Sequence, residues 1–368
     1  MDRNPRYDRH YQLAGFGAAA QEKLEQAAVL VVGAGGLGCP VLQYLTAAGV
    51  GRIGIVDHDT IEINNLQRQV LFATGEIGLP KAETAARKLR NLNPEITIEA
   101  HVLRLSAANA AGLVVGYDVV VDCTDNFTTR YLLGDCCRLL DKPLVFGAIF
   151  RYEGQVAVFN VAGPDGVKTT YRHLFPTPPG AADAPDCNTA GVLGVLPGTI
   201  GTLQATEVIK IITGTGEPLY NRLMTINLLD YSTLILDIPS RITGAAAGIP
   251  GTLGELEMTD YDTCCAAEVP AGIGTVSSDR FNGIATGKDT LVIDVRNPDE
   301  LPRLSTPHTA IPLPELEAYT GTFDSRNIVV VCQSGQRSLA AAALLRKKLD
   351  NTYTISHLEG GIASLQQI

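Results

Sequence analysis

The sequence lacks three features that mark secreted, membrane-spanning and nucleic-acid-binding proteins. Its first residues, Met1–Arg6, contain no apolar segment, so we expect no secretory signal and a cytoplasmic location. The most apolar long stretch, 191–213, includes proline, glutamine, glutamate and lysine, and we expect a buried helix rather than a membrane span. Basic residues are outnumbered, 29 against 39 acidic, and the net charge of −10 argues against nucleic acid or an anionic membrane as main partner.

Cysteine is present, but not in the setting of a disulfide-rich secreted protein. Eight cysteines in 368 residues without a secretory signal indicate a reducing compartment and free thiols. Four of them are expected as small core residues: Cys39, Cys123, Cys136 and Cys137. The length favours two domains, and a hydrophobic share of 45% is enough to build sizeable cores.

Alternating strand and helix patterns predict an α/β fold. A Rossmann-like, doubly wound, mostly parallel sheet is expected because buried strands alternate with helices over the first 150 residues. The predicted strands are 27–32, 52–56, 96–100, 117–121 and 143–149, with helices at 81–91 and 127–140. Three later strands, 155–160, 223–229 and 233–238, predict an antiparallel extension.

A second, small α/β domain is predicted at the end of the chain. Strands at 291–295 and 328–331 and a helix at 338–349 support it. We therefore expect a first domain over 1–239, a Gly- and Ala-rich linker over 240–275 and a second domain over 276–368. The segment 175–190 is rich in proline, alanine and aspartate, and a loop of this length is usually functional or mobile.

A glycine-rich loop follows the first predicted strand. Gly33, Gly35 and Gly38 have the spacing of a dinucleotide-binding loop, and Asp57 follows at the distance of a ribose-binding acid. Such glycines let the backbone approach phosphate oxygens at the start of a helix. Taken alone, the motif predicts a nucleotide, with NAD as the default.

Other groups favour a triphosphate over NAD. The segment Asn64–Arg68 supplies amides and a guanidinium, and Lys81 begins a helix, where a cation needs a nearby anion. Asp125 ends the fourth strand as a hard oxygen ligand for Mg²⁺. Arg9 precedes the first strand and could reach a phosphate from a partner subunit. The alternatives are that Arg68 and Lys81 are surface charges and that Asp125 caps a helix.

The motifs together resemble the ubiquitin-activating-enzyme superfamily, and within it the bacterial MoeB/ThiF adenylyltransferases. The resemblance runs from about residue 6 to 238, through Gly33–Pro40, Val56–Asp59, Asn65–Gln69, Gly78–Lys81 and Asp122–Asn126. It implies a homodimer that adenylates the C-terminal Gly-Gly of a ubiquitin-like sulfur carrier protein with Mg-ATP, with Arg9 supplied by the second subunit. The implied ATP-binding residues are Gly33, Gly35, Gly36, Gly38, Asp57, Asn64, Asn65, Leu66, Gln67, Arg68, Lys81, Asp125 and Asn126.

The resemblance also concerns cysteines outside the nucleotide motifs. It places Cys187, in the 175–190 loop, at the family's acceptor position for a thioester or acyl-disulfide; the alternative is an idle exposed thiol. The family usually carries a zinc held by two Cys-x-x-Cys pairs. Here the matching segments, 170–173 and 242–245, contain no cysteine, and Cys264 and Cys265 are adjacent. We therefore expect no tetrahedral structural zinc.

A second loop, Cys332–Arg337, follows another apolar run and opens a helix. Such a turn aims backbone N–H groups at the sulfur and stabilises a thiolate or persulfide. With Val292–Arg296 and Leu358–Gly361 it resembles a rhodanese, in which Asp294 and Arg296 would brace the loop. The alternative is a cysteine phosphatase, whose Cys-x5-Arg loop is one residue longer.

The two loops in one chain predict two linked reactions. An ATP-dependent adenylation of the carrier's C-terminal glycine would be followed by sulfur transfer from a Cys332 persulfide, which a donor such as a cysteine desulfurase would load. The carrier could belong to molybdopterin synthesis, thiamine synthesis or tRNA thiolation. The alternatives are an NAD-linked oxidoreductase, for which no histidine is placed as a hydride-side base, and a non-catalytic carrier-binding module, which Lys81 and Asp125 disfavour.

Overall fold

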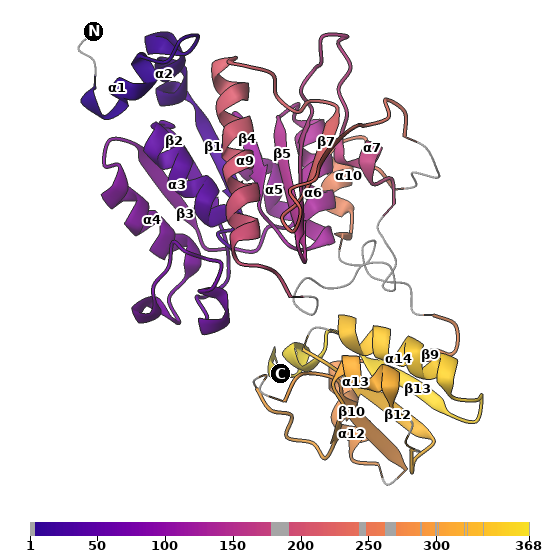
Figure 1. Ribbon diagram of the computed structural model, residues 1–368. Helices are drawn as coiled ribbons and strands as arrows, with labels where there is room; N and C mark the ends of the chain where they lie inside the picture. The colour runs from indigo at the N-terminus through magenta and orange to yellow at the C-terminus, as the bar shows by residue number, and fades with distance from the viewer. Residues whose placement is uncertain are drawn as a thin grey trace. The chain divides into compact units, whose positions relative to one another are not determined.

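The protein forms two compact units, seen in a computed structural model (Figure 1). The structure describes residues 4–177, 191–242, 248–261, 270–287, 289–298, 300, 302–319, 321, 323–333 and 335–367. Of these, residues up to 261 belong to the first unit and residues from 270 onward to the second. The predicted linker includes a helix, α10 (Leu253–Met258), which packs against α5 (Ala107–Val114) and α6 (Phe127–Leu139) of the first unit. The exact domain boundaries stay a prediction.

The first unit is built on an eight-stranded sheet with the order β3-β2-β1-β4-β5-β6-β7-β8. The first five strands are parallel: β1 (Ala28–Val32), β2 (Arg52–Val56), β3 (Thr97–His101), β4 (Val119–Asp122) and β5 (Leu144–Phe150). The last three are antiparallel: β6 (Glu153–Phe159), β7 (Arg222–Asn227) and β8 (Thr233–Asp237). The predicted fold class, including its antiparallel extension, is confirmed.

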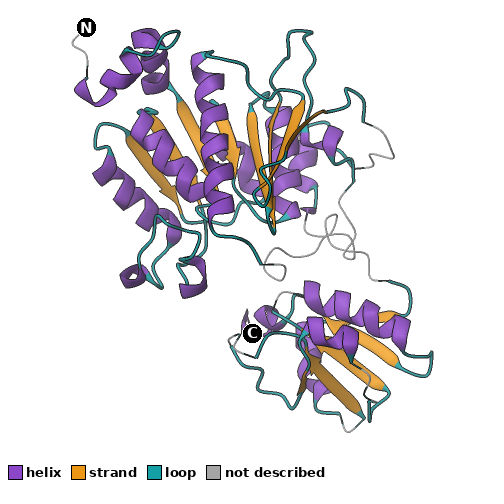
Figure 2. Ribbon diagram, viewed as in Figure 1, coloured by secondary structure: helices purple, strands orange, loops and turns teal. Residues whose placement is uncertain are grey.

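Helices cover both faces of this sheet, because strands such as β1 are apolar on both sides and buried along their whole length (Figure 2). One face carries α2 (Gly17–Gln26), α3 (Gly38–Ala48), α4 (Lys81–Leu92) and α9 (Val195–Thr213). The other carries α5 (Ala107–Val114), α6 (Phe127–Leu139), α7 (Tyr171–Leu174) and α10. Shorter elements are η1 (Pro5–Tyr7), α1 (Asp8–Tyr11), η2 (Ile63–Asn65) and η3 (Thr74–Glu76).

The apolar stretch expected as a buried helix is α9. Its polar residues have partners, since Gln204 donates to the Asp122 carbonyl at 2.7 Å and Lys210 pairs with Glu207 at 2.7 Å. No helix of the described residues combines the length and apolar character needed to cross a membrane.

The second unit contains a five-stranded parallel sheet with the order β11-β10-β12-β13-β9. Its strands are β9 (Ile273–Val276), β10 (Thr290–Asp294), β11 (Thr309–Ala310), β12 (Asn327–Val331) and β13 (Thr354–Leu358). The helices α13 (Leu313–Ala318) and α14 (Gln336–Lys348) pack on one face, and α12 (Ser278–Ala285) with η4 (Ile362–Gln367) on the other. Each face therefore has its own core.

Candidate active sites

The parallel register brings three strand ends to one edge of the first sheet. Val32, the last residue of β1, pairs with Val56 of β2 and with Asp122 of β4. The glycine loop, Asp57 and the turn after Asp122 therefore lie side by side, at the carboxyl edge where ligands bind in such sheets.

The glycine loop packs closely against its surroundings at some positions and not at others. Gly33 has a φ of 97°, and a Cβ there would lie 2.7 Å from the Cys123 carbonyl oxygen. A Cβ at Gly38 would lie 2.0 Å from the Gly33 carbonyl oxygen, whereas one at Gly35 would meet only the Gln69 side chain at 3.6 Å. At Gly36 a Cβ would be 3.0 Å from Pro197, so the start of α9 covers the loop. Gly33 and Gly38 are thus sterically required.

Asp57 is held against the glycine loop by one carboxylate oxygen and against its own turn by the other. Oδ2 accepts from the Ala34 N–H at 2.7 Å, and Oδ1 accepts from the Asp59 N–H at 2.8 Å. Burial raises the pKa of Asp57, and the Lys81 ammonium and the two N–H donors oppose that rise. Each carboxylate oxygen keeps a second lone pair, so the group could still accept a ligand hydroxyl.

Lys81 is buried, with 6% of its surface exposed, so the alternative of a solvated surface charge is wrong. It is the first residue of α4, and its Nζ lies 2.9 Å from Oδ2 of Asp59, a half-exposed carboxylate. Asp59 is a site residue to which the sequence analysis gave no role, although it stands inside the Val56–Asp59 motif. Side chains of Asp57, His58 and Asp59 approach one another within 4.8 Å, and no ligand is assigned to them.

The segment Asn64–Arg68 forms η2 and the turn after it. Asn65 is buried and donates to the Asn64 side chain at 2.7 Å, while Arg68 is half-buried and donates to the Asn64 carbonyl at 3.0 Å. Leu66 packs against the core, and Gln67 is exposed. A Cβ at Gly36 would lie 3.4 Å from the Arg68 side chain, so this segment borders the glycine loop.

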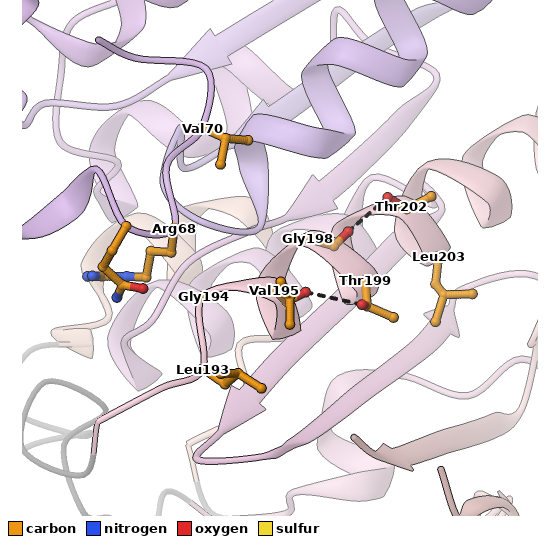
Figure 3. A pocket seen from close by; sticks show the side chains of 10 residues that line it. Arg68, Val70, Leu193, Gly194, Val195, Gly198, Thr199, Thr202 and Leu203 are labelled. Atoms are coloured by element: carbon orange, nitrogen blue, oxygen red, sulfur yellow. Dashed lines mark hydrogen bonds between the residues drawn. The ribbon is translucent and has the colours of Figure 1, made fainter. Parts of the chain in front are cut away.

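Arg68 also lines a surface pocket of about 710 Å³ (Figure 3). Arg68 is the charged residue of the lining. The hydroxyls of Thr199 and Thr202 in the pocket wall donate to helix carbonyls at 3.1 and 2.8 Å. The other lining residues are Gln67, Val70, Leu193, Gly194, Val195, Gly198 and Leu203. The pocket is mainly apolar and is not itself a triphosphate site.

Asp125 and Asn126 have different roles in the turn after β4. Asn126 caps α6, because its side-chain oxygen accepts from the Thr129 N–H at 2.9 Å. The alternative of Asp125 as the cap is therefore wrong. The Asp125 carboxylate is exposed and makes no hydrogen bond or ion pair with any described residue, so it is available to a ligand. Arg130, which the sequence analysis did not identify, donates to the Thr124 carbonyl at 2.8 Å and fixes this turn.

Arg9 lies at the opposite edge of the sheet from the glycine loop of its own chain. Tyr7, just before α1, packs on Gly49 and accepts from Asn93 at 2.9 Å, and these two residues follow the ends of α3 and α4. Because α3 and α4 connect parallel strands, their carboxyl ends lie at the amino ends of the strands, opposite the glycine loop. Figure 1 shows α1 and the start of α9 at opposite ends of the first unit. One chain thus does not bring Arg9 to its own nucleotide loop.

Cys332 is enclosed by the first turn of α14. Its Sγ accepts from the Gly335 N–H at 3.1 Å and from the Ser338 N–H at 3.2 Å, and the residue is 0% exposed. Gly335 is the N-cap of the helix and has a φ of 91°, a conformation that favours glycine. The loop therefore directs peptide dipoles at one sulfur atom, as the sequence predicts.

Two arginines flank this sulfur and are themselves neutralised. Arg296 forms a buried pair with Asp294 at 2.8 Å and donates to the Gln333 side chain at 3.1 Å, which supports the interpretation that both residues brace the loop. Arg337 forms a bidentate pair with Glu300, with both bonds 2.6 Å long. This pair holds the pKa of Glu300 below its usual range. Sequence reasoning missed Glu300 because nothing in its local pattern indicates a partner 37 residues away.

Several cysteine predictions can be placed. Cys39, Cys123, Cys136 and Cys137 are free and buried, as expected. Cys187, Cys264, Cys265 and residues 243–245 lie outside the described residues. At the first expected zinc segment, His173 accepts from the Thr170 N–H at 3.1 Å and so caps α7, and burial lowers its pKa.

Comparison with known families is consistent with both sites. The ThiF family matches residues 7–243, which is more than half of the chain. The chain belongs to the ThiF family. A rhodanese-like domain matches residues 279–367, which include the Cys332 loop, so this ThiF protein carries a rhodanese-like domain at its end.

Relatives of this ThiF protein share both parts or the first one. It is 38% identical to a probable adenylyltransferase/sulfurtransferase MoeZ of Mycobacterium tuberculosis, over 98% of this chain and 92% of that one. It is 46% identical to a sulfur carrier protein adenylyltransferase of Thermus thermophilus, over 71% of this chain and 96% of that one. A crystal structure of E. coli MccB with ATP has a TM-score of 0.56 at 25% identity, covering 67% of this chain and 75% of the other. The names of these relatives imply ATP as the nucleotide.

Proposed function

We propose that this ThiF protein adenylates the C-terminal glycine of a ubiquitin-like sulfur carrier with Mg-ATP and then delivers sulfur to it from a Cys332 persulfide. The names of the two relatives, a sulfur carrier adenylyltransferase and an adenylyltransferase/sulfurtransferase, support the pairing of these reactions. The observation that carries the nucleotide half is Lys81, a buried cation paired with the half-exposed Asp59 at the carboxyl edge of the sheet.

Each group at this edge has a task in phosphate chemistry. The N–H groups at the start of α3 suit phosphate oxygens, and Asp57 suits a ribose hydroxyl. Lys81, and Arg68 at the loop border, would offset the phosphate charge that repels an attacking carboxylate. The remaining proposed contacts come from Gly33, Gly35, Gly36, Gly38, Asn64, Asn65, Leu66, Gln67 and Asn126.

A magnesium ion fits the residues present. The Asp125 carboxylate is exposed, free of described partners and adjacent to the proposed phosphate site, and hard oxygen donors suit Mg²⁺. Bound there with ATP, the ion would supply further positive charge at the phosphates. We assign the ion to Asp125 and no structural zinc to the chain.

The partner subunit would complete the site. Because Arg9 lies at the far edge of its own sheet, a homodimer in which it reaches the other copy's phosphates is proposed. The free buried thiols suit a reducing cytoplasm.

Sulfur transfer would proceed through an acyl disulfide. The outer sulfur of the Cys332 persulfide attacks the acyl carbon, forms a carbon–sulfur bond and expels AMP, which leaves an acyl disulfide. Attack by a second thiol, for which Cys187 is the candidate, then forms a disulfide with Cys332 and releases the carrier thiocarboxylate. A reductant restores the two thiols, and a sulfane donor such as a cysteine desulfurase reloads Cys332.

ATP–pyrophosphate exchange in the presence of a Gly-Gly carrier tests the adenylation. Asp125→Asn should reduce exchange by about 100-fold or more, since a lost electrostatic contact to a transition state has this size of effect. Asp141→Asn is the matched control, because Asp141 is also an exposed aspartate but pairs with Lys168 at 2.6 Å. No exchange with carriers of all three pathways, or full exchange in Asp125→Asn, would refute the proposal.

A further inference from the structure

One buried group of the second unit is not used by the proposed sulfur chemistry. His357, in β13, is 6% exposed, and neither of its ring nitrogens has a hydrogen-bond partner among the described residues. Buried polar atoms are nearly always paired, because leaving one unpaired costs free energy. This imidazole therefore requires an explanation other than core filling.

The sheet places His357 on the same face as Cys332. It pairs in parallel register with Val330 of β12, and paired residues of neighbouring strands share a face. Cys332 follows Val330 by two residues, which returns the chain to that face. Val330 and Cys332 both belong to the core beneath α14, which also contains Ala341. His357 thus lies under the helix whose first turn encloses the sulfur.

The ring is linked to the sulfur through Gly335. The Gly335 backbone is close enough to favour the protonated ring, although neither nitrogen reaches hydrogen-bonding geometry. The N–H of the same residue donates to Sγ of Cys332 at 3.1 Å. A Cβ on Gly335 would lie 2.9 Å from the Gly360 nitrogen, so the loop rests on the turn that follows β13. The segment 357–360 therefore contains both the imidazole and the backbone on which the cysteine loop rests.

The electrostatic surroundings of the ring are simple. Burial lowers the pKa of His357, and Glu359 and the Gly335 backbone oppose that effect. Its partners in the two neighbouring strands are Thr275 of β9 and Val330 of β12, and both are neutral. Among the described residues, the core on this face contains the titratable side chains of Cys332, directly after β12, and Tyr353, directly before β13. Arg346 of α14 donates to the Tyr353 carbonyl at 2.8 Å.

We propose that His357 is a positioning residue for Cys332, which holds the Gly335 peptide in place and couples the sulfur site to pH. The imidazole acts on the Gly335 backbone, beside which it lies, and keeps that residue's N–H aimed at Sγ. An apolar side chain of similar size could fill the same space but offers no polar atom to Gly335. This inference rests on the proposed role of Cys332.

The pH profile of sulfur transfer tests this role in the full chain. With thiosulfate as donor and cyanide as acceptor, His357→Leu should lower kcat/KM about tenfold at pH 7, because Gly335 would lose the polar neighbour that keeps its N–H aimed at the sulfur. It should also move the rising limb of the profile to higher pH, and His357→Gln should restore part of the rate. His308→Gln is the matched control, because His308 is exposed and bonds to the Thr306 carbonyl at 2.8 Å. An unchanged profile in a folded His357→Leu protein would overturn the proposal.

A second measurement needs neither turnover nor a folded His357 variant. NMR titration of the ring in the wild-type chain and in Cys332→Ser should give different midpoints for His357, because coupling between two sites is reciprocal. Identical midpoints would overturn the proposal. Absence of thiosulfate–cyanide turnover in the wild type would instead count against the proposed sulfur-transfer function, and the titration would still decide the role of His357.

Discussion

The glycine loop after β1 and the cysteine loop after β12 both join a buried parallel strand to the first turn of a helix, but they are filled differently. In the second unit the N–H groups of Gly335 and Ser338 already donate to the sulfur of the same chain. In the first unit the loop is bound by Asp57 at Ala34, which leaves the start of α3 free for an external anion. The same backbone turn thus holds a built-in sulfur atom in the second unit, and we propose that it holds an external anion in the first.

The charges beside the two loops follow the same division. Arg337 is neutralised by a bidentate pair with Glu300, whereas Lys81 pairs through one oxygen with the half-exposed Asp59. A bidentate pair is stronger and geometrically more specific than a single contact. The first arrangement therefore braces a fixed sulfur, and we propose that the second exchanges a carboxylate for a phosphate when ATP binds.

The largest effect is expected from a substitution that disrupts the glycine loop. Gly38→Ala places a Cβ 2.0 Å from the Gly33 carbonyl oxygen, whereas Gly35→Ala meets only a flexible side chain at 3.6 Å. We expect Gly38→Ala to destabilise the first unit by about 3 kcal/mol or more and to abolish pyrophosphate exchange, and Gly35→Ala to change stability by less than about 1 kcal/mol. Chemical denaturation monitors the first effect. Equal stability of the two variants would show that the close approach is not required.

An intermediate effect is expected from the brace of the cysteine loop. Glu300→Gln removes the charge that pairs with Arg337, and we expect a loss of about 1–2 kcal/mol in the stability of the second unit at pH 7. Glu315→Gln, at an exposed position of α13, should have almost no effect. Thermal unfolding with a probe in the second unit distinguishes the two variants.

The same pair predicts a pH dependence. Because the folded protein lowers the pKa of Glu300 from its reference value of 4.5, the stabilisation is fully present above that pH and is lost as the pH falls through the folded value. Acid destabilisation of the second unit in this range should be weaker in Glu300→Gln than in the wild type. Parallel stability curves for the two proteins would contradict the assignment.

The smallest effect is expected from a substitution of the carboxylate that pairs with Lys81 in the first unit. Asp59→Asn removes the carboxylate that competes with phosphate for Lys81, so ATP should bind about 3- to 10-fold more tightly at low salt, with the gain reduced by added salt. Isothermal titration calorimetry measures the affinity for ATP, with Asp141→Asn as the charge-matched control. Weaker binding in Asp59→Asn would mean that this carboxylate instead orients the lysine.

The sequence was sufficient to predict the two loops and the sheets because their signals are local. Gly33 and Gly38 stand at fixed spacing after an apolar strand, and Cys332 stands at the end of another. Parallel pairing then brings Asp57 to the glycine loop without further information. The residues that were missed are defined by tertiary contacts. Asp59 acquires its role only when α4 brings Lys81 to it, and Glu300 only when α14 packs beside it.

Other groups are identified only once the chain has folded. Nothing in the sequence around Arg9 says that α1 lies at the amino edge of its own sheet, which follows from Tyr7 packing on Gly49. In the same way, the sequence around His357 predicts an ordinary strand residue. Only the register of β13 against β12 shows that it lies on the face of the sheet beneath the cysteine loop.

The complete burial of Cys332 has a consequence for the order of events. At 0% exposure its own sulfur atom is shielded from the acyl carbon at the end of a carrier's tail. An added sulfur would stand one bond farther out, where an incoming acyl group could meet it. Without a persulfide on Cys332, the enzyme would therefore not react with an activated carrier. Formation of the persulfide would have to precede sulfur transfer.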